Sequence, residues 1–305
     1  MTTTETTRQD IYSRITDQIV GHLAKGVKPW TQPWNAAHAA GPVTRPLRFN
    51  GEAYSGINVL TLWASAMERA YAAPIWMTFK QALELGGHVR KGEKGSPVVY
   101  ANTIQRSEHD EKTGEDVDVT IPFMKGYTVF NVDQIEGLPA HYYAVADGAV
   151  NPDERDARAE AFFASMGARI LNGGNAAFYR MASDHIQMPP FEVFFDAQRY
   201  YATLAHESVH WTRHPARLDR SFGQQAFGDT GYAKEELVAE LGAAFLCADL
   251  GLKLEDRQDH AAYIGSWLQV LRDDKRAIFA AAAHAQRAAD YLHRLQPQAA
   301  LEAAE

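Results

Sequence analysis

Cysteine and long hydrophobic runs are what this 305-residue sequence has least of. A single cysteine, Cys247, excludes an internal disulfide and a zinc site built from cysteines. The sequence has no run of about eighteen apolar residues, which excludes a membrane-spanning helix. Residues 1–9 are rich in threonine and lack a hydrophobic segment, so they do not form a secretory signal. Together these absences predict a protein of the reducing cytoplasm.

The composition is that of an ordinary globular chain, with 46% hydrophobic and 22% charged residues. A formal net charge of −8 disfavours wholesale nucleic-acid binding, but the charge is unevenly spread. Residues 20–105 hold nine basic and four acidic side chains, whereas residues 141–305 hold sixteen basic and twenty-three acidic ones. The sequence therefore predicts a basic segment in the first half of an acidic protein.

The spacing of apolar and turn-forming residues predicts two α+β domains, 10–140 and 150–295, with the boundary between Ala140 and Asn151. In the first domain we expect helices at 10–24, 58–71 and 78–85, and strands at 89–101 and 117–131 around a charged excursion at 105–116.

The second domain is predicted to be mainly helical with a small sheet. Helices are expected at 151–166, 196–213 and 232–250, followed by one or two more up to residue 295. The turn Asn172–Asn175 predicts a hairpin of 169–171 and 177–181. Residues 186–190, which end in two prolines, are expected to form an edge strand.

The strongest motif is His206-Glu207-Ser208-Val209-His210. Residues four apart share one face of a helix, so the two imidazoles can bind one metal ion. Glu207 would then lie beside the open coordination position, where it can deprotonate a bound water. The alternative is a helix with two ordinary histidines, but the apolar residues on either side, from Tyr200 to Trp211, favour the metal site. We expect Zn²⁺, with another divalent ion such as Mn²⁺ as the alternative.

A catalytic zinc ion needs a third protein ligand and an open fourth position. No histidine follows at the short spacing of a metzincin, whereas Glu236 and Glu240 share one face of the next predicted helix. One can bind the metal while the other hydrogen-bonds a ligand histidine, and two solvated acids are the alternative. The pattern Glu-x-x-Ala-acid resembles the third-ligand helix of gluzincins, where the first carboxylate binds the metal. This resemblance implies Glu236 as the ligand and Glu240 as the residue that orients a histidine.

Aromatic and basic residues are interleaved in the first half, which holds four of the six tryptophans. Aromatic faces that stack on bases, beside cations that follow phosphates, are typical of proteins that bind single strands without sequence preference. The alternative is that the tryptophans are core and the cations a solvated face. The candidate DNA-contacting residues are Lys28, Trp30, Trp34, Arg48, Tyr54, Asn58, Lys80, Arg90, Lys91 and Lys94.

Four motifs follow one another in the first half: Pro29-Trp30 with Pro33-Trp34, Asn50 to Asn58, Trp76 to Ala82, and Gly86 to Gly95. With the segment Tyr127 to Gln134, they look like the N-terminal domain of ArdC-type antirestriction proteins. The second half is similar to the zincin-like metallopeptidase domain that follows it in that family. Its matching motifs are His206 to Thr212, Arg217 to Arg220, and Tyr232 to Gly242.

The resemblance implies a protein that binds single-stranded DNA and protects incoming plasmid or phage DNA from host restriction. Its expected partners are single-stranded DNA and an unidentified protein substrate, such as a host restriction protein or a DNA-bound protein. The expected peptidase would use His206, His210 and Glu236 as ligands, and Glu207 to move a proton from water to the leaving amine. Two alternatives stay open: a DNA-tethered protease acting on DNA-bound proteins, and a non-enzymatic coating protein with a structural metal site. An intact Glu207 argues against the latter.

Overall fold

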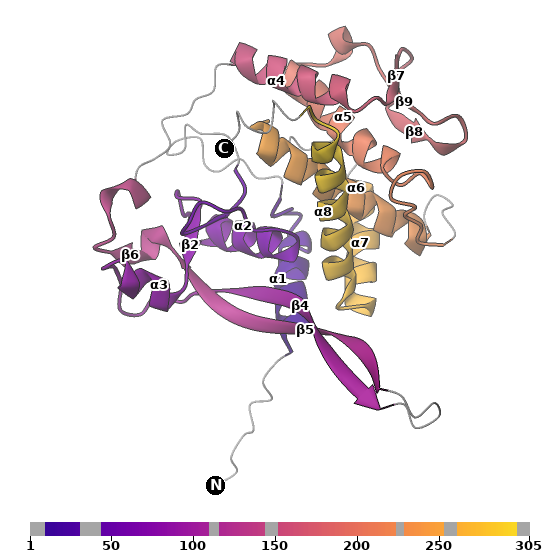
Figure 1. Ribbon diagram of the computed structural model, residues 1–305. Coiled ribbons are helices and arrows are strands. Elements are labelled where there is room, and N and C mark those ends of the chain that lie inside the picture. Colours follow the sequence, from indigo (N-terminus) through magenta and orange to yellow (C-terminus); the bar gives the residue numbers. More distant parts are fainter. Residues whose placement is uncertain are drawn as a thin grey trace.

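The computed structural model describes residues 10–30, 44–109, 116–143, 152–223, 229–252 and 261–297. It confirms the α+β class and the two-domain architecture (Figure 1). The boundary predicted between Ala140 and Asn151 falls largely on residues 144–151, outside the described part of the chain. Within the described ranges, no helix is both long enough and apolar enough to cross a membrane.

The N-terminal domain packs helices against a four-stranded sheet of order β1-β2-β5-β4. Strands β1 and β2 are parallel, and the other neighbours are antiparallel. A second, two-stranded sheet pairs β3 with β6. The elements are α1 (Ile11–Leu23), β1 (Leu47–Arg48), α2 (Ile57–Arg69), β2 (Ile75–Met77), α3 (Phe79–Glu84), β3 (His88–Val89), β4 (Ser96–His109), β5 (Asp116–Asn131) and β6 (Ile135–Glu136).

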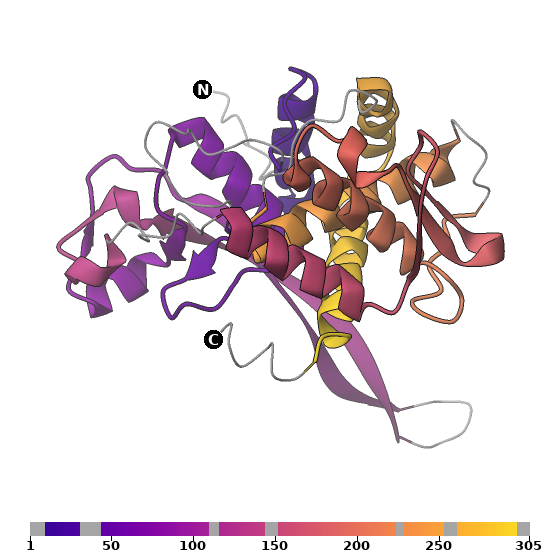
Figure 2. The same ribbon diagram turned by 90° about the horizontal axis from the view of Figure 1, so that it is seen from above.

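Strands β4 and β5 form a long hairpin that projects from the body of the molecule (Figures 1 and 2). Their register is unbroken from the pair Ser96 and Val129 to the pair His109 and Asp116. Of the charged stretch 105–116, expected as an excursion between the strands, residues 105–109 and Asp116 belong to the strands, and residues 110–115 lie outside the described part of the chain. Composition was misleading here because a two-stranded ribbon exposed on both faces needs no alternating apolar side chains.

The C-terminal domain combines a three-stranded sheet with a bundle of helices. The predicted hairpin of 169–171 and 177–181 is wrong, because β9 lies between β7 and β8 in the sheet. The expected edge strand at 186–190 is instead this central strand, on which Ile186 and Met188 are fully buried. The elements are α4 (Pro152–Ser165), β7 (Arg169–Asn172), β8 (Phe178–Arg180), β9 (His185–Met188), α5 (Ala197–Trp211), α6 (Thr230–Leu250), α7 (Ala261–Asp273) and α8 (Ala277–Arg294).

Helix α6 lies at the centre of the C-terminal bundle and contacts α5, α7 and α8. It is apolar nearly all round, as expected for a helix covered on every side. Gly242 faces α5, where a Cβ atom would lie 2.7 Å from a methyl group of Val209. This small residue lets α5 and α6 approach closely, and these are the two helices that carry the candidate metal ligands.

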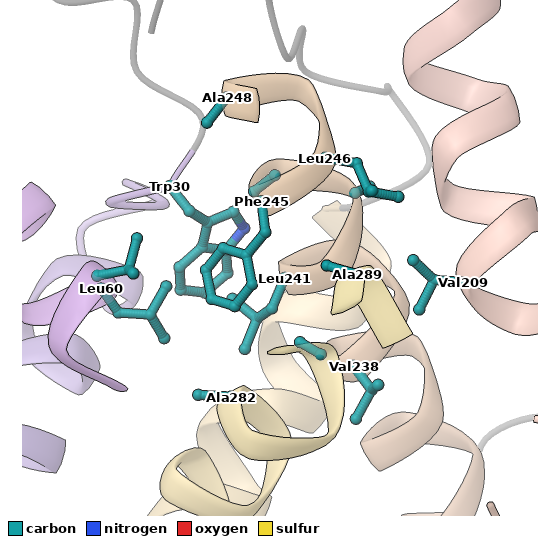
Figure 3. Close-up of a cluster of buried hydrophobic side chains, with 14 of the residues drawn as sticks. Trp30, Leu60, Val209, Val238, Leu241, Phe245, Leu246, Ala248, Ala282 and Ala289 are labelled. Atoms are coloured by element: carbon teal, nitrogen blue, oxygen red, sulfur yellow. The ribbon is translucent and has the colours of Figure 1, made fainter. Parts of the chain in front are cut away.

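The two domains share one hydrophobic core. Trp30 and Leu60 of the N-terminal domain lie beside Phe245 and Leu241 of α6 (Figure 3). Trp30 also contacts the ring of Trp267 on α7, with 6.2 Å between the ring centroids. The candidate metal centre therefore has the N-terminal domain packed against one of its supporting helices.

Candidate metal centre

Helix α5 presents both histidines of the motif on one buried face. Asp196 begins the helix by accepting a hydrogen bond from the backbone of Arg199 at 2.8 Å, an N-terminal cap. His206 and His210 lie one turn apart, and their Nε2 atoms are 3.2 Å from each other. The spacing of the motif thus aims the two ring nitrogens at one point, as the sequence predicted.

Glu236 of α6 faces the same point. Its Oε2 atom lies 3.5 Å from His206 Nε2, and its Oε1 atom lies 3.4 Å from His210 Nε2. One donor atom from each of the three residues lies within 4.8 Å of the others. Two imidazole nitrogens and one carboxylate oxygen fit a catalytic divalent metal ion, because three protein ligands leave a coordination position open.

The electrostatics of the three residues favour positive charge between them. Burial alone would raise the pKa of Glu236, but His210 and His206 lower it well below its usual range. Burial alone would lower the pKa of His210, yet the carboxylates of Glu236 and Glu235 raise it to about 10. The site therefore attracts a cation, and a bound metal ion would supply that charge without a proton.

The outer nitrogen of His210 has a carboxylate partner that sequence reasoning missed. His210 Nδ1 lies 3.1 Å from Glu235 Oε1, and the Glu235 carboxylate accepts hydrogen bonds from Arg220 at 2.8 and 2.9 Å. The sequence analysis considered Glu236 and Glu240 because they share one helix face. Glu235 lies on a different face and was therefore not considered. The Arg217-Leu-Asp-Arg220 motif was a signal, since it places an arginine shortly after the motif helix.

Glu240 lies on the other side of the centre, where its Oε2 atom is 3.8 Å from His206 Nδ1. Its Oε1 atom accepts hydrogen bonds from Lys28 Nζ at 3.1 Å and from Trp30 Nε1 at 3.3 Å. Glu240 therefore lies beside the outer nitrogen of His206, but at more than hydrogen-bond distance, and its orienting role stays a prediction. Its hydrogen bonds with Lys28 and Trp30 place these two candidate DNA-contacting residues inside the protein.

A cavity of about 290 Å³ lies over these residues. Glu207, the expected general base, lines it and is only 3% exposed. Tyr232 and Tyr263, whose hydroxyl oxygens are 3.1 Å apart, form part of the wall. The other lining residues are Ala177, Phe178, Tyr179, His206, His210, Arg213 and Glu236. Glu207 and the three candidate metal ligands thus line one space beside β8.

Three arginines at the end of α5 and just after it have different surroundings. Arg217 lies over the ring of Trp211 and pairs with Asp184, and Arg220 pairs with Glu235. Neither lines the cavity. Arg213 does, and among the described residues it has no carboxylate within ion-pair distance, while its buried Nε atom has no hydrogen-bond partner. Within the described part of the chain, the cavity therefore contains an arginine without an ion-pair partner.

The structure corrects four of the candidate DNA-contacting residues. Lys28, Trp30 and Tyr54 are buried, so the prediction that they contact DNA is wrong for this conformation. Asn58 exchanges two 2.8 Å hydrogen bonds with the backbone of Val99 and so ties α2 to β4. These residues look like surface residues from composition, but their partners are distant in the sequence. Trp34 lies outside the described residues.

The remaining candidates are exposed basic side chains: Arg48, Lys80, Arg90, Lys91 and Lys94. Three of them have nearby carboxylates, in the pairs Arg48–Glu52, Lys80–Glu84 and Arg90–Glu93. For Lys91 and Lys94, no ion pair is found among the described residues.

Sequence reasoning also missed an exposed aromatic ring, Phe79, which is 52% exposed. Phe79 is the first residue of α3, and the capping box of Thr78 and Gln81 fixes it there. Its ring contacts Phe130, whose own ring lies close to Gly95. Phe79 therefore lies near the loop that carries Lys94.

A motif helix with two histidines, a carboxylate from the following helix and a cavity beside the outermost strand of a small sheet define a zincin-like metallopeptidase fold. The model of that zincin-like metallopeptidase family matches residues 157–284. The model of the N-terminal domain of anti-restriction factor ArdC matches residues 9–130. The chain belongs to the ArdC antirestriction family.

Individual proteins support this assignment. The chain is similar to the antirestriction protein ArdC of plasmid R388 in its metal-free structure, with 49% identity and a TM-score of 0.78 over 94% of this chain and 98% of that one. The Mn(II)-bound structure of the same R388 protein is 47% identical, with a TM-score of 0.76, and again 94% of this chain and 98% of that chain are covered. The uncharacterized protein y4eC of Sinorhizobium fredii is 44% identical over 98% of this chain and 97% of its own. DNA primase TraC of Escherichia coli is 38% identical over 93% of this chain, which spans only 27% of the primase.

Proposed function

We propose that the chain is an antirestriction protein that binds single-stranded DNA without sequence preference and hydrolyses peptide bonds with a divalent metal ion. The observation that carries the peptidase is the position of Glu207, which shares one cavity with His206, His210 and Glu236. A structural metal site needs no such carboxylate beside its ligands. Zinc is the proposed ion because the donor set is two imidazoles and one carboxylate, and Mn²⁺ is the alternative.

His206, His210 and Glu236 would hold the ion, which would lower the pKa of a water molecule and act as a Lewis acid toward the peptide carbonyl. Glu207 takes the proton from the attacking water and transfers it to the leaving amine. The hydroxyl groups of Tyr232 and Tyr263 line the same cavity and are the proposed neutral donors to a developing oxyanion. Burial raises the pKa of Tyr232, so its hydroxyl keeps its proton near neutral pH.

The wall of the cavity formed by Ala177, Phe178 and Tyr179 suits an extended peptide. Strand β8 pairs with β9 on one side and is the last strand of the sheet on the other. An outermost strand presents backbone groups to which a peptide can add as a further strand. Arg213 supplies a positive charge in the same cavity, which favours a substrate with an anionic group near the cleaved bond.

For DNA, the proposed surface is smaller than the sequence suggested and is centred on Phe79, Lys80, Lys91 and Lys94. An exposed ring offers a stacking platform, and the cations follow the backbone. The shared core holds this domain against the metal-centre domain, which favours proteins bound to the same DNA as substrates.

The peptidase is tested with wild-type protein and Glu207→Gln, each analysed for bound metal and for proteolysis with and without a single-stranded oligonucleotide. We expect both proteins to bind one metal ion per chain and only the wild type to cleave. Cleavage by Glu207→Gln would refute the assigned base. If Glu207→Gln still protects DNA from restriction in cells, protection comes from DNA binding; if protection is lost, it comes from the peptidase.

The DNA surface is tested on the full chain by fluorescence anisotropy with labelled single strands and duplexes at several salt concentrations. We expect Lys91→Glu/Lys94→Glu to weaken single-strand binding and to flatten its salt dependence, because fewer counterions are released. Phe79→Ala should weaken binding with an unchanged salt slope, since stacking releases none. Equal affinity for duplex and single strand would contradict the proposal.

A further inference from the structure

Each of the two candidate ligand histidines has a buried carboxylate beside its outer nitrogen, 3.1 Å from His210 Nδ1 and 3.8 Å from His206 Nδ1. On one side, His210 Nδ1 faces Glu235, which is paired with Arg220. On the other side, His206 Nδ1 faces Glu240, which is paired with Lys28. In each case a buried carboxylate stands between the histidine and a buried cation. The difference is the origin of the cation, because Arg220 belongs to the metallopeptidase domain and Lys28 to the N-terminal domain.

Lys28 is held in this position by the fold of the N-terminal domain. Helix α1 ends at Leu23, and Gly26 then adopts a positive φ of 73°, which turns the chain toward α6. The Lys28 side chain is 3% exposed and reaches Glu240 at 3.1 Å. Trp30, two residues later, packs against Trp267 and donates to the same carboxylate oxygen at 3.3 Å.

We propose that Lys28 and Trp30 are positioning residues of the metal centre, so that the N-terminal domain completes a site whose ligands all lie in the other domain. Burying a carboxylate is costly unless a cation or hydrogen-bond donors replace its lost hydration. Lys28 and Trp30 supply both to one oxygen of Glu240 and leave the other oxygen toward His206. A carboxylate held beside the outer nitrogen, here at 3.8 Å, favours the tautomer and the ring orientation that direct the other nitrogen to the metal.

This arrangement couples the two domains through the metal. If the contact of Lys28 with Glu240 raises the metal affinity by some factor, the bound metal strengthens that contact by the same factor. Metal binding is then expected to stabilise the packing of the segment after α1 on α6. The inference rests on the metal site and not on proteolysis, so it stands even if the chain cleaves no peptide.

The experiment measures the affinity of the full chain for Zn²⁺ and for Mn²⁺ by competition with a chromophoric chelator. We expect Lys28→Met to weaken binding by about 10- to 100-fold, the usual cost of losing an outer support. Trp30→Phe keeps an aromatic ring but removes the N–H group that donates to Glu240, so we expect a smaller loss of metal affinity than in Lys28→Met. Lys28→Arg restores a cation and should recover most of the affinity.

Arg45 provides the matched control. It is also a buried cation that joins the domains, through hydrogen bonds of 2.6 and 2.7 Å to Asp249, but it contacts none of the metal ligands. Arg45→Gln should lower the thermal stability and leave the metal affinity unchanged. In metal-loaded protein, the ¹⁵N chemical shift of His206 Nδ1 should move in Lys28→Met and not in Arg45→Gln.

Unchanged or tighter metal binding in Lys28→Met would overturn the proposal, because it would show that Lys28 acts on the metal only as a repelling charge. An equal loss of affinity in Arg45→Gln would also overturn it, since the effect would then follow from loosened domain packing. If Lys28→Met does not fold, Trp30→Phe decides: wild-type affinity and an unshifted His206 resonance in that variant refute the positioning role.

Discussion

Replacing Arg220 with methionine removes the cation that supports His210 through Glu235. The Arg220 side chain is 1% exposed and donates two hydrogen bonds to the Glu235 carboxylate, at 2.8 and 2.9 Å. It donates two more, to the Thr212 hydroxyl at 3.1 Å and to the Val209 carbonyl at 2.9 Å. Methionine fills part of the same space and donates nothing, so Arg220→Met leaves the Glu235 carboxylate buried without its arginine partner and with His210 beside it.

Removing one partner of a buried ion pair costs roughly 3–5 kcal/mol, because the remaining charge is uncompensated. We expect metal-free Arg220→Met to lose about that much free energy of unfolding. In Arg220→Met/Glu235→Met both charges are gone, and the main remaining cost is the unpaired Nδ1 of His210, roughly 1–3 kcal/mol. The double variant should therefore be about 2 kcal/mol more stable than the single one.

The second substitution should therefore change stability and metal affinity differently. Urea unfolding of the metal-free proteins, followed by circular dichroism, gives the first quantity, and chelator competition gives the second. The double variant should regain stability but keep a metal affinity about 10- to 100-fold below wild type, because His210 still lacks its carboxylate. A double variant less stable than Arg220→Met, or one with wild-type metal affinity, would refute the reasoning.

The same ion pair predicts an effect of acid. Burial alone would raise the pKa of Glu235, but Arg220 and His210 lower it from 4.5 to about 2. A lowered carboxyl pKa contributes stability that is fully present above the unfolded value of 4.5 and is lost as the pH falls toward 2. In Arg220→Met the pKa of Glu235 rises, so the loss should begin at higher pH. Urea midpoints measured between neutral and acidic pH test this, and identical profiles would contradict it.

Three further predictions follow from single contacts. Glu236→Ala should abolish stoichiometric metal binding, whereas Glu240→Ala should lower the metal affinity by about 10- to 100-fold. If metal analysis shows that Glu240→Ala loses the metal and Glu236→Ala keeps it, the two roles are reversed. Gly242→Ala places a methyl group against Val209 and should cost roughly 1–3 kcal/mol of unfolding free energy, a loss that urea titration would detect and that wild-type stability would disprove. In a Glu207→Gln background, Arg213→Met should weaken binding of peptides with an acidic side chain or a terminal carboxylate, and leave their neutral amide analogues unaffected in calorimetry.

The sequence was sufficient where the chemistry depends on short spacing. His206 and His210 lie four residues apart on one helix, and the structure brings them to one point with Glu236 from the next helix. The capped helix at Thr78 could be read in the same way, because its capping box needs only four consecutive residues. Such signals stay within one element and do not depend on how distant elements pack.

Sequence reasoning failed where the deciding partner is far along the chain. Lys28 and Trp30 look like DNA-binding residues by composition, and only Glu240, about 210 residues later, gives them another role. The prediction that β7 and β8 pair as a hairpin was wrong for a related reason. A turn signal predicts a tight connection between two strands, but it does not tell which strand becomes the neighbour of each in the sheet. Phe79 was missed because a single aromatic residue at a helix start follows no pattern.

The shared core also decides how the two domains can be studied. A fragment that ends near residue 140 would expose Trp30 and Leu60, which are buried against α6 in the full chain. A fragment that starts near residue 150 would leave Glu240 without Lys28 and Trp30, and Asp249 without Arg45. Uncovered apolar surface and unpaired buried charges each weaken a fold, so inactivity of either fragment would say little about its function. Point variants of the full chain are therefore the sharper test, since they change one contact and leave the core covered.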